Sequence, residues 1–230
     1  MALKEDLIGL SITNTTAGVV PFNGSVKMLG TNPIAIAFPG LKEPPVLIDF
    51  ASSTVSYGKV EIAKRKGEMI PTGWCIDKVG YSTNNPVEMI DGGALLPLGG
   101  DKDGGGHKGY CLASMVDILT AVLSGANWGP FAVPFAINVT PPNKEVGKGI
   151  GHFFGAWDID DFRDKEAFKK SIDEWIYTMR NTKPQTGKKV LIPGDPEKGS
   201  LSNKNEGGHP RKYRGCCFTA RYCWLYRNKN

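Results

Sequence analysis

The fold is decided by residues 99–125, GGDKDGGGHKGYCLASMVDILTAVLSG, where a glycine-rich loop leads into an apolar segment. We expect a helix over 109–124, because apolar side chains recur at intervals of three and four and Gly125 supplies a stop. The apolar positions are Leu112, Met115, Val116, Leu119, Val122 and Leu123. Free backbone N–H groups at the helix start, beside Lys108, favour an anion. A flexible surface loop before an ordinary helix is the alternative interpretation.

Two phosphate-binding motifs can be tested against these glycines. Gly104, Gly106 and Gly109 match the G-x-G-x-x-G spacing of the Rossmann dinucleotide site. The acidic residue that this site needs further on is missing, because no Asp or Glu lies between Asp117 and Glu145. The preceding LLPLGGDKD is also a poor core strand. The P-loop motif fails as well, since Gly and Tyr follow Lys108.

The surrounding segments alternate between strand-like and helix-like patterns, which favours an α/β fold. Strand-like patterns occupy the end of 7–15, then 32–40, 45–53, 130–140 and 188–197, and the last leads into a turn. Pro134 interrupts the fourth of these strands. Helix-like patterns occupy 56–68 and 164–181, the latter with Phe168, Ile172, Trp175, Ile176 and Met179 on one face. Residues 70–93, rich in Pro, Gly and Asn, are expected to form a surface loop.

The composition narrows the class of protein. The chain has 230 residues, of which 40% are hydrophobic, so it can form a substantial core. No apolar run is long enough to span a bilayer, and the charges at 4–6 argue against a signal peptide. The five cysteines do not suggest a disulfide framework. We therefore expect a cytoplasmic protein with no membrane partner.

The positive charge is concentrated at the carboxyl end. Residues 199–230 carry a net charge of +6, so residues 1–198 are close to neutral. We expect one domain over 1–198 and a poorly ordered basic tail over 199–230. His209, Cys216, Cys217 and Cys223 lie in this tail but lack a C-x-x-C pair, so no metal site is predicted. The alternative function is a non-catalytic interaction protein that uses the basic and aromatic tail, although a nucleic-acid partner is not expected.

Five blocks of sequence carry a family resemblance. They are MLGTNPIAIAFPG, VLIDFASSTVSYGKVEIAKRKGEMIPTGWCIDKVG, GALLPLGGDKDGGGHKGYCLASMVDILTAVLSGA, GHFFGAWDID and VLIPGDPE. In this order they resemble the malate/L-lactate dehydrogenase family, whose NAD(P)-dependent oxidoreductases include ureidoglycolate and sulfolactate dehydrogenases. The resemblance spans residues 4–198. It implies an α/β fold with a mixed sheet and flanking helices, not a Rossmann fold.

The resemblance also implies which residues contact the cofactor, NAD or NADP. These residues are Thr15, Asp49, Phe50, Ala51, Lys108, Gly109, His152, Pro193, Gly194, Asp195, Pro196 and Glu197. Taken alone, Asp49 could instead cap the SST turn that follows it, and His152 could be a packed histidine among aromatic residues.

The implied reaction is hydride transfer between NAD(P) and a small 2-hydroxy acid such as malate or lactate, in a homodimer. The family's proton-exchanging histidine and its carboxylate-binding residues precede the segment matched here, so no catalytic residue is assigned. We therefore expect cofactor affinity to exceed catalytic competence. After EGGHP at 206–210 the chain departs from the family pattern, which we interpret as a shifted reading frame or a mispredicted exon.

Overall fold

The computed structural model describes residues 1–134, 140 and 142–196. These residues form two compact units, each made of separate stretches of the chain. The first unit holds residues 1–11, 35–49 and 154–196, and the second holds 12–34 and the described part of 50–153. The predicted boundary at residue 198, and the tail beyond it, lie outside the described residues.

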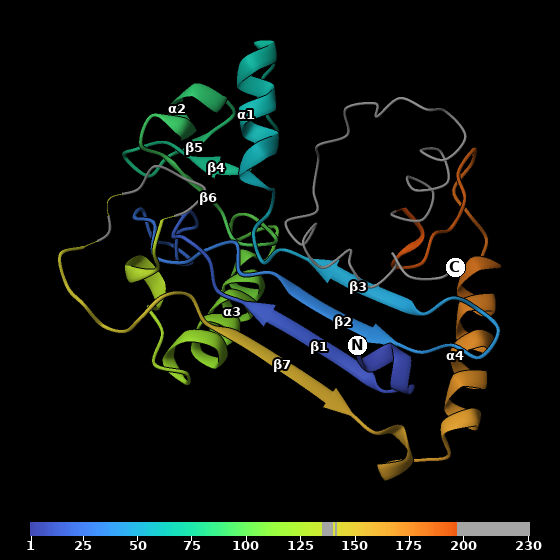
Figure 1. The fold of residues 1–230 in the computed structure, drawn as a ribbon. Coiled ribbons are helices and arrows are strands. Elements are labelled where there is room, and N and C mark those ends of the chain that lie inside the picture. Colours follow the sequence, from blue (N-terminus) through green and yellow to red (C-terminus); the bar gives the residue numbers. More distant parts are fainter. Residues whose placement is uncertain (135–139, 141, 197–230) are drawn as a thin grey trace, which may run out of the picture. The chain divides into compact units, whose positions relative to one another are not determined.

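A four-stranded sheet contributes strand residues to the first unit. Its strands are β1 (Ile8–Thr13), β2 (Ile34–Phe38), β3 (Val46–Phe50) and β7 (His152–Trp157). They lie in the order β3-β2-β1-β7, and neighbouring arrows in Figure 1 point in opposite directions. A short 3-10 turn, η1 (Ala2–Glu5), precedes β1. The strand predictions at 7–15, 32–40 and 45–53 are confirmed.

Helix α4 (Lys165–Arg180) covers apolar residues of this sheet. Its start is capped by Asp164, whose carboxylate accepts the N–H of Ala167, and η4 (Ile159–Asp161) precedes it. Ile176 is fully buried against Val46, and Ile192 joins the same cluster. The predicted strand at 188–197 is wrong, because residues 188–196 form no strand. The buried Ile192 fixes this segment by its side chain instead.

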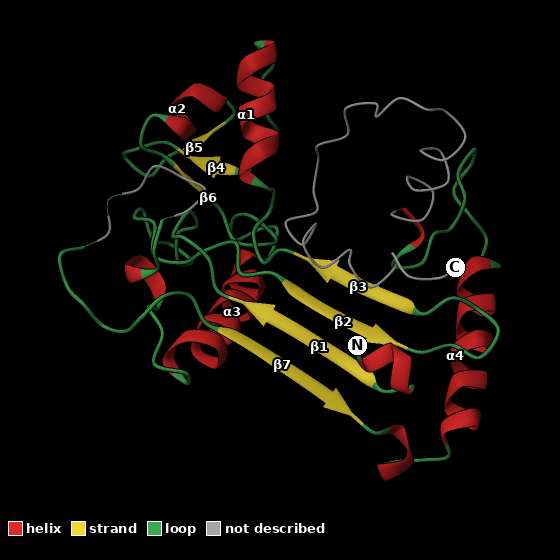
Figure 2. Cartoon of the chain, viewed as in Figure 1, coloured by secondary structure: helices red, strands yellow, loops and turns green. Residues whose placement is uncertain are grey.

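The second unit contains α1 (Tyr57–Lys66), which ends at Gly67 as predicted. The stretch 70–93, predicted as a surface loop, holds three further elements (Figure 2). They are β4 (Cys75–Ile76), β5 (Ser82–Thr83) and α2 (Pro86–Ile90), and β4 also pairs antiparallel with β6 (Ala94–Leu95). That prediction was wrong because two short strands with buried residues leave little periodicity in a sequence rich in Gly and Pro.

Helix α3 (Gly106–Asp117) begins three residues earlier than predicted and continues into a π-turn, η2 (Ile118–Val122). Of the apolar positions named above, Val116 is fully buried and Leu112 and Leu119 are half-buried. The other buried side chains of α3 and η2 are small or polar, as at Ala113, Thr120 and Ala121. Met115, Ile118, Val122 and Leu123 are 43%, 56%, 52% and 68% exposed.

Small buried residues are needed at the start of α3, because glycines there bring the helix close to other backbone. A Cβ at Gly109 would overlap the backbone of Leu98, and one at Gly106 would overlap the carbonyl oxygen of Gly100. Small residues are needed wherever two backbones approach this closely. The fold is therefore α/β, and the glycines of 104–109 do not join a parallel strand to a helix in the Rossmann manner.

The structure bears on two further predictions, the strand over 130–140 and the lack of a membrane-spanning segment. The strand expected over 130–140 lies partly outside the described residues, and its first residues instead form a 3-10 turn, η3 (Gly129–Phe131). Among the described residues, no helix is long and apolar enough to cross a membrane.

Candidate functional site

The segment around Thr15 is held by buried hydrogen bonds within the second unit. The backbone N–H of Thr15 donates to Asn32 Oδ1 at 3.1 Å, and its hydroxyl oxygen accepts the N–H of Thr31 at 3.0 Å. Thr15 is 6% exposed, so its polar atoms are committed to the protein. Gly30 is required beside them, because a Cβ there would overlap Thr15. Thr15 therefore fixes the backbone of this segment rather than offering an open hydroxyl.

This cluster continues to residues 51–53 and to α3. The N–H and the hydroxyl of Ser52 both donate to the carbonyl oxygen of Thr31, at 2.8 and 3.0 Å. The N–H of Leu98 donates to the Ser52 carbonyl, and Gly109 packs on Leu98. The structure thus connects three predicted cofactor segments, at Thr15, Ala51 and Gly109, through one chain of contacts.

Asn32 joins the same cluster to the body of α3. Its Nδ2 donates to the carbonyl of Ala113 at 3.0 Å while its Oδ1 holds Thr15. Asn32 is fully buried, and its backbone φ of 33° is a value that residues other than glycine rarely adopt. Such strain persists only where the surroundings impose it, and it is common at functional sites.

In the glycine-rich loop before α3, the exposed Lys108 ammonium group, and not free backbone N–H groups, is available to bind an anion. The N–H groups of Gly104, Gly105, Gly106 and Lys108 all donate to acceptors within residues 101–105. The expectation of free N–H groups at this helix start is therefore wrong for these four. Lys108 is exposed, and the space above the Gly105 backbone lies within 3.7 Å of its ammonium nitrogen. An exposed ammonium group over glycine backbone can receive a phosphate.

A second polar cluster surrounds Asn14 and Asp117. Both carboxylate oxygens of Asp117 accept the N–H of Gly129, at 3.2 and 2.9 Å, and Asn14 is a further hydrogen-bond partner. Burial raises the pKa of Asp117, although these hydrogen bonds act in the opposite direction. Asn14 Oδ1 accepts the N–H of Gly151 at 2.9 Å, directly before His152.

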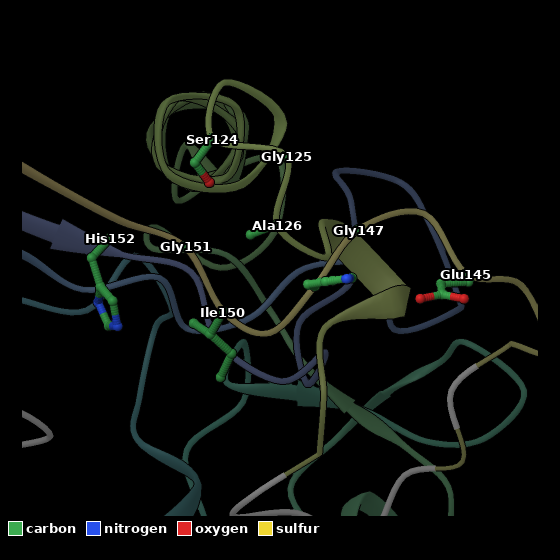
Figure 3. A pocket seen from close by; sticks show the side chains of 9 residues that line it. Ser124, Gly125, Ala126, Glu145, Gly147, Ile150, Gly151 and His152 are labelled. Atoms are coloured by element: carbon green, nitrogen blue, oxygen red, sulfur yellow. The ribbon is translucent and has the colours of Figure 1, made fainter.

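His152 is exposed and lines an open cavity of about 700 Å³. The cavity lies within the second unit, with His152 toward one end and Glu145 toward the other (Figure 3). Lys148 and the backbone of Gly147 and Gly151 also line it. Because His152 is exposed, the alternative that it is a packed core histidine is not supported.

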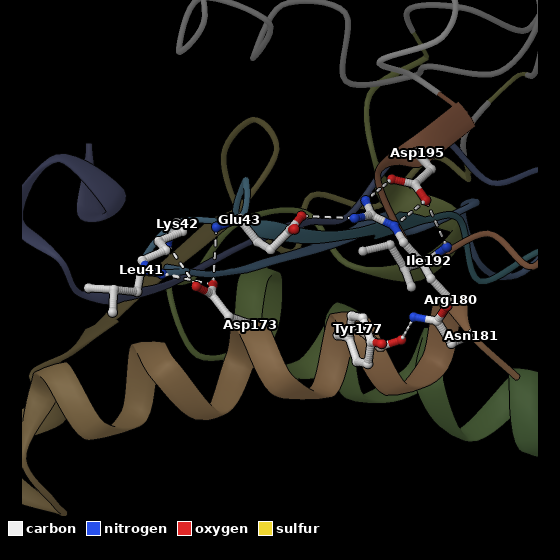
Figure 4. A network of polar contacts seen from close by, with 9 residues as sticks. All are labelled: Leu41, Lys42, Glu43, Asp173, Tyr177, Arg180, Asn181, Ile192 and Asp195. Carbon is white, nitrogen blue, oxygen red and sulfur yellow. Dashed lines mark hydrogen bonds and ion pairs between the residues drawn. The ribbon is translucent and has the colours of Figure 1, made fainter.

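The turn at 192–195 belongs to the first unit and is closed by its own side chain. The Asp195 carboxylate accepts the N–H of Ile192 at 3.1 Å and an Arg180 nitrogen at 2.9 Å. Arg180 also donates to Glu43 at 2.8 Å (Figure 4), and the two carboxylates raise the pKa of its guanidinium. Gly194, with a φ of 97°, packs on Leu47 of β3. The turn therefore lies beside the strand that ends near Asp49.

The other predicted residues are placed as follows. Asp49 is exposed on β3, Phe50 and Ala51 are half-buried, and Pro193 and Pro196 are exposed. Glu197 lies outside the described residues. No group of three or more metal-ligating side chains occurs within the part of the chain that the structure describes.

The sequence analysis missed the residues that organise these segments, namely Asn14, Asn32, Asp117 and Arg180. Asp117 did leave a signal, because it is the one carboxylate in the otherwise apolar run SMVDILTAV. A lone charge in a buried helix needs a partner, and such positions are candidates for function. The other three depend on partners far away in the sequence.

The comparisons with known proteins agree with this architecture. A family model described as malate/L-lactate dehydrogenase matches residues 1–212. The chain belongs to this family. The malate dehydrogenase of Pyrococcus horikoshii is 42% identical over 204 residues, which are 88% of this chain and 54% of that protein.

A solved structure and a further relative extend the likeness. The structure of a sulfolactate dehydrogenase from Methanocaldococcus jannaschii matches with a TM-score of 0.77 and 36% identity, over 92% of this chain and 57% of that one. A (2R)-3-sulfolactate dehydrogenase (NADP(+)) of Chromohalobacter salexigens is 37% identical over 161 residues, 70% of this chain and 45% of that protein. The chain thus spans about half the length of these relatives, and the α/β fold without a Rossmann site is confirmed.

Proposed function

We propose that this chain forms the nicotinamide-cofactor-binding part of an oxidoreductase that transfers a hydride between NAD(P) and a small 2-hydroxy acid such as malate or lactate. The observation that carries the proposal is the buried chain of contacts joining the segments at Thr15, Ala51 and Gly109 in a chain of this family. A cofactor site needs such pre-organised backbone, because binding must not first order flexible segments.

The described residues fit a dinucleotide in their chemistry. Lys108 supplies a positive charge for phosphate, and Asp49 on β3 can accept hydrogen bonds from ribose hydroxyl groups. His152 offers an exposed imidazole beside an open cavity, and the turn at 193–196 presents backbone close to β3. When bound, the nicotinamide ring supplies the hydride chemistry, and the protein supplies binding and orientation.

Oxidation of a 2-hydroxy acid also needs a base for the hydroxyl proton and a cation for the carboxylate. We assign neither among the described residues, because each of the segments above is proposed to serve the cofactor. The first prediction is therefore that the 230-residue chain binds NADH or NADPH more readily than it turns over malate or lactate.

Calorimetric titration with NADH and with NADPH, alongside assays of malate and lactate oxidation, tests this prediction. We expect a dissociation constant roughly within the micromolar-to-millimolar range common for enzyme ligands, with little turnover. Comparing the two nucleotides also decides between NAD and NADP. Absence of binding by both would refute the proposed cofactor site, whereas robust turnover would refute the claim of weak catalysis.

We further propose a cytoplasmic location and, as the resemblance implies for full-length members of the family, a homodimer. Cys75 and Cys111 are free thiols, and burial raises the pKa of Cys75 to about 12, so this thiol stays protonated and unreactive. Light scattering on the purified chain measures its oligomeric state.

A non-catalytic role of the tail rests on residues 199–230, outside the described residues. An RNA-binding shift that disappears when these residues are deleted would favour it.

A further inference from the structure

Asp117 is the only carboxylate with a buried side chain among the residues that the structure describes. It ends a helix whose other buried residues are glycine, alanine and valine, and it is 6% exposed. A buried carboxylate is costly to desolvate, and its hydrogen bonds must compensate for that cost. An apolar residue of similar size would avoid this cost. The presence of a carboxylate at this buried position therefore suggests a role beyond stability.

The contacts of Asp117 orient Asn14. An ionised carboxylate can only accept hydrogen bonds, so Asn14 must turn its Nδ2 toward Asp117. The same Nδ2 donates to the carbonyl oxygen of Asn127 at 2.8 Å, which leaves Oδ1 to accept the N–H of Gly151 at 2.9 Å. Asn14 is fully buried, so no water can replace a partner that is lost.

The oriented amide joins two segments that carry proposed cofactor contacts. Asn14 directly precedes Thr15, and Gly151 directly precedes His152. Thr13 adds a second link, because its hydroxyl donates to the Gly151 carbonyl oxygen at 2.8 Å. Gly151 cannot shift toward η2, since even a Cβ would overlap the Thr120 carbonyl oxygen. The backbone before His152 is thus held on both sides.

We propose that Asn14 and Asp117 act as a pair of positioning residues that hold Thr15 and His152 in the arrangement that binds the nicotinamide cofactor. This inference rests on the proposed function. Neither residue touches the cofactor. Asp117 acts by fixing the orientation of the Asn14 amide, and Asn14 acts by joining the Gly151 backbone to the segment at 13–15.

The test compares NADH affinity, measured by fluorescence titration, in Asp117→Asn, Asn14→Ala and the double variant. An asparagine at 117 has one acceptor oxygen and one donor nitrogen in place of two acceptor oxygens, so its amide nitrogen faces either the Gly129 N–H or Asn14 Nδ2, and the hold on Asn14 weakens. We expect each single variant to bind NADH about tenfold more weakly, as is typical when a group that orients a ligand-binding residue is lost. The double variant should be no weaker than Asn14→Ala, because both changes break the same unit.

Asp77→Asn is the matched control. It makes the same chemical change in a carboxylate that accepts N–H groups only of its own loop, from Val79 and Tyr81 at 2.9 Å each. Its NADH affinity should equal that of the unaltered protein. Circular dichroism and thermal unfolding of every variant confirm that affinity is measured on folded protein. If Asp117→Asn does not fold, Asn14→Ser provides the second test, since a serine hydroxyl is too short to bridge Asn127 and Gly151.

Each outcome decides a different claim. Unchanged NADH affinity in folded Asp117→Asn or Asn14→Ser overturns the positioning role and leaves the proposed function intact. Independent losses that multiply in the double variant overturn the claim that the two residues act as a unit. If the unaltered chain binds neither NADH nor NADPH, the proposed function fails, and this inference fails with it.

Discussion

The two units hold their proposed cofactor segments by different physical means. In the second unit, Thr15 and its neighbours are fixed by buried amide and hydroxyl groups. In the first, the 192–195 turn is fixed by an ion pair whose Arg180 side chain is 33% exposed and whose Asp195 side chain is 15% exposed. Buried networks fail when one member is lost, because the remaining polar groups cannot find water. Exposed ion pairs weaken gradually and respond to salt.

The largest effect is expected from adding a methyl group where α3 meets Leu98. Gly109→Ala should lower the free energy of unfolding by about 2–3 kcal/mol, because well-packed contacts do not accommodate an added carbon without displacement. Urea unfolding measures this change. Gly58→Ala in α1 is the control: no atom lies within 4 Å of its added Cβ, so it should stabilise the protein by about 0.5–1 kcal/mol. Similar unfolding midpoints in the two variants would show that α3 packs less tightly than described.

A smaller effect is expected in the first unit from Arg180→Gln. Loss of the guanidinium removes the ion pair with Asp195 and should lower stability by about 1 kcal/mol at low salt, a value reduced for partial exposure. Hydrogen exchange at the Ile192 N–H, which donates to Asp195, reports the turn directly. Glu43→Gln leaves the Arg180–Asp195 pair in place and should preserve that protection. Equal loss of protection in both variants would place the turn's stability elsewhere.

The salt dependence of stability should also differ between the variants of the two units. In 1 M salt, where screening acts over about 3 Å, the difference between Arg180→Gln and the unaltered protein should shrink. The effect of Gly109→Ala should persist, because overlap between atoms is not screened. An Arg180→Gln effect that does not depend on salt would indicate a packing role for the guanidinium stem.

The smallest effect concerns pH and the buried carboxylate. The pKa of Asp117 is raised from its ordinary value of 3.8 by burial, so the unfolded chain ionises this group first as pH rises. The contribution of Asp117 to stability is therefore most favourable below pH 3.8 and declines as pH rises through the folded-state pKa. Asp117→Asn lacks this decline, so the difference in unfolding free energy between the two proteins should change with pH from 4 upward. Parallel stability curves would contradict the raised pKa.

Local patterns predicted much of the architecture. The strands at 34–38 and 46–50 and the helices at 57–66 and 165–180 each have enough apolar periodicity, or a clear enough boundary, to be found. The strand predicted at 188–197 failed because Ile192 is buried by its side chain without any ladder partner. Of the organising residues, Asn14 and Arg180 could not be predicted, because Asn14 acts on Gly151 and Arg180 on Glu43, each across more than a hundred residues.

The inverted packing of α3 has a consequence for mutational tolerance. In most helices leucine and methionine positions resist substitution, and alanine and glycine positions accept it. In α3 and η2 the order should be reversed at several positions, because Gly106 and Gly109 face other backbone and Ala113 is fully buried, while Met115 and Ile118 face outward in this chain. A saturation library of residues 106–123, selected for folded protein, should therefore retain polar replacements at Met115, Ile118, Val122 and Leu123 and lose nearly every replacement at Gly106, Gly109 and Ala113.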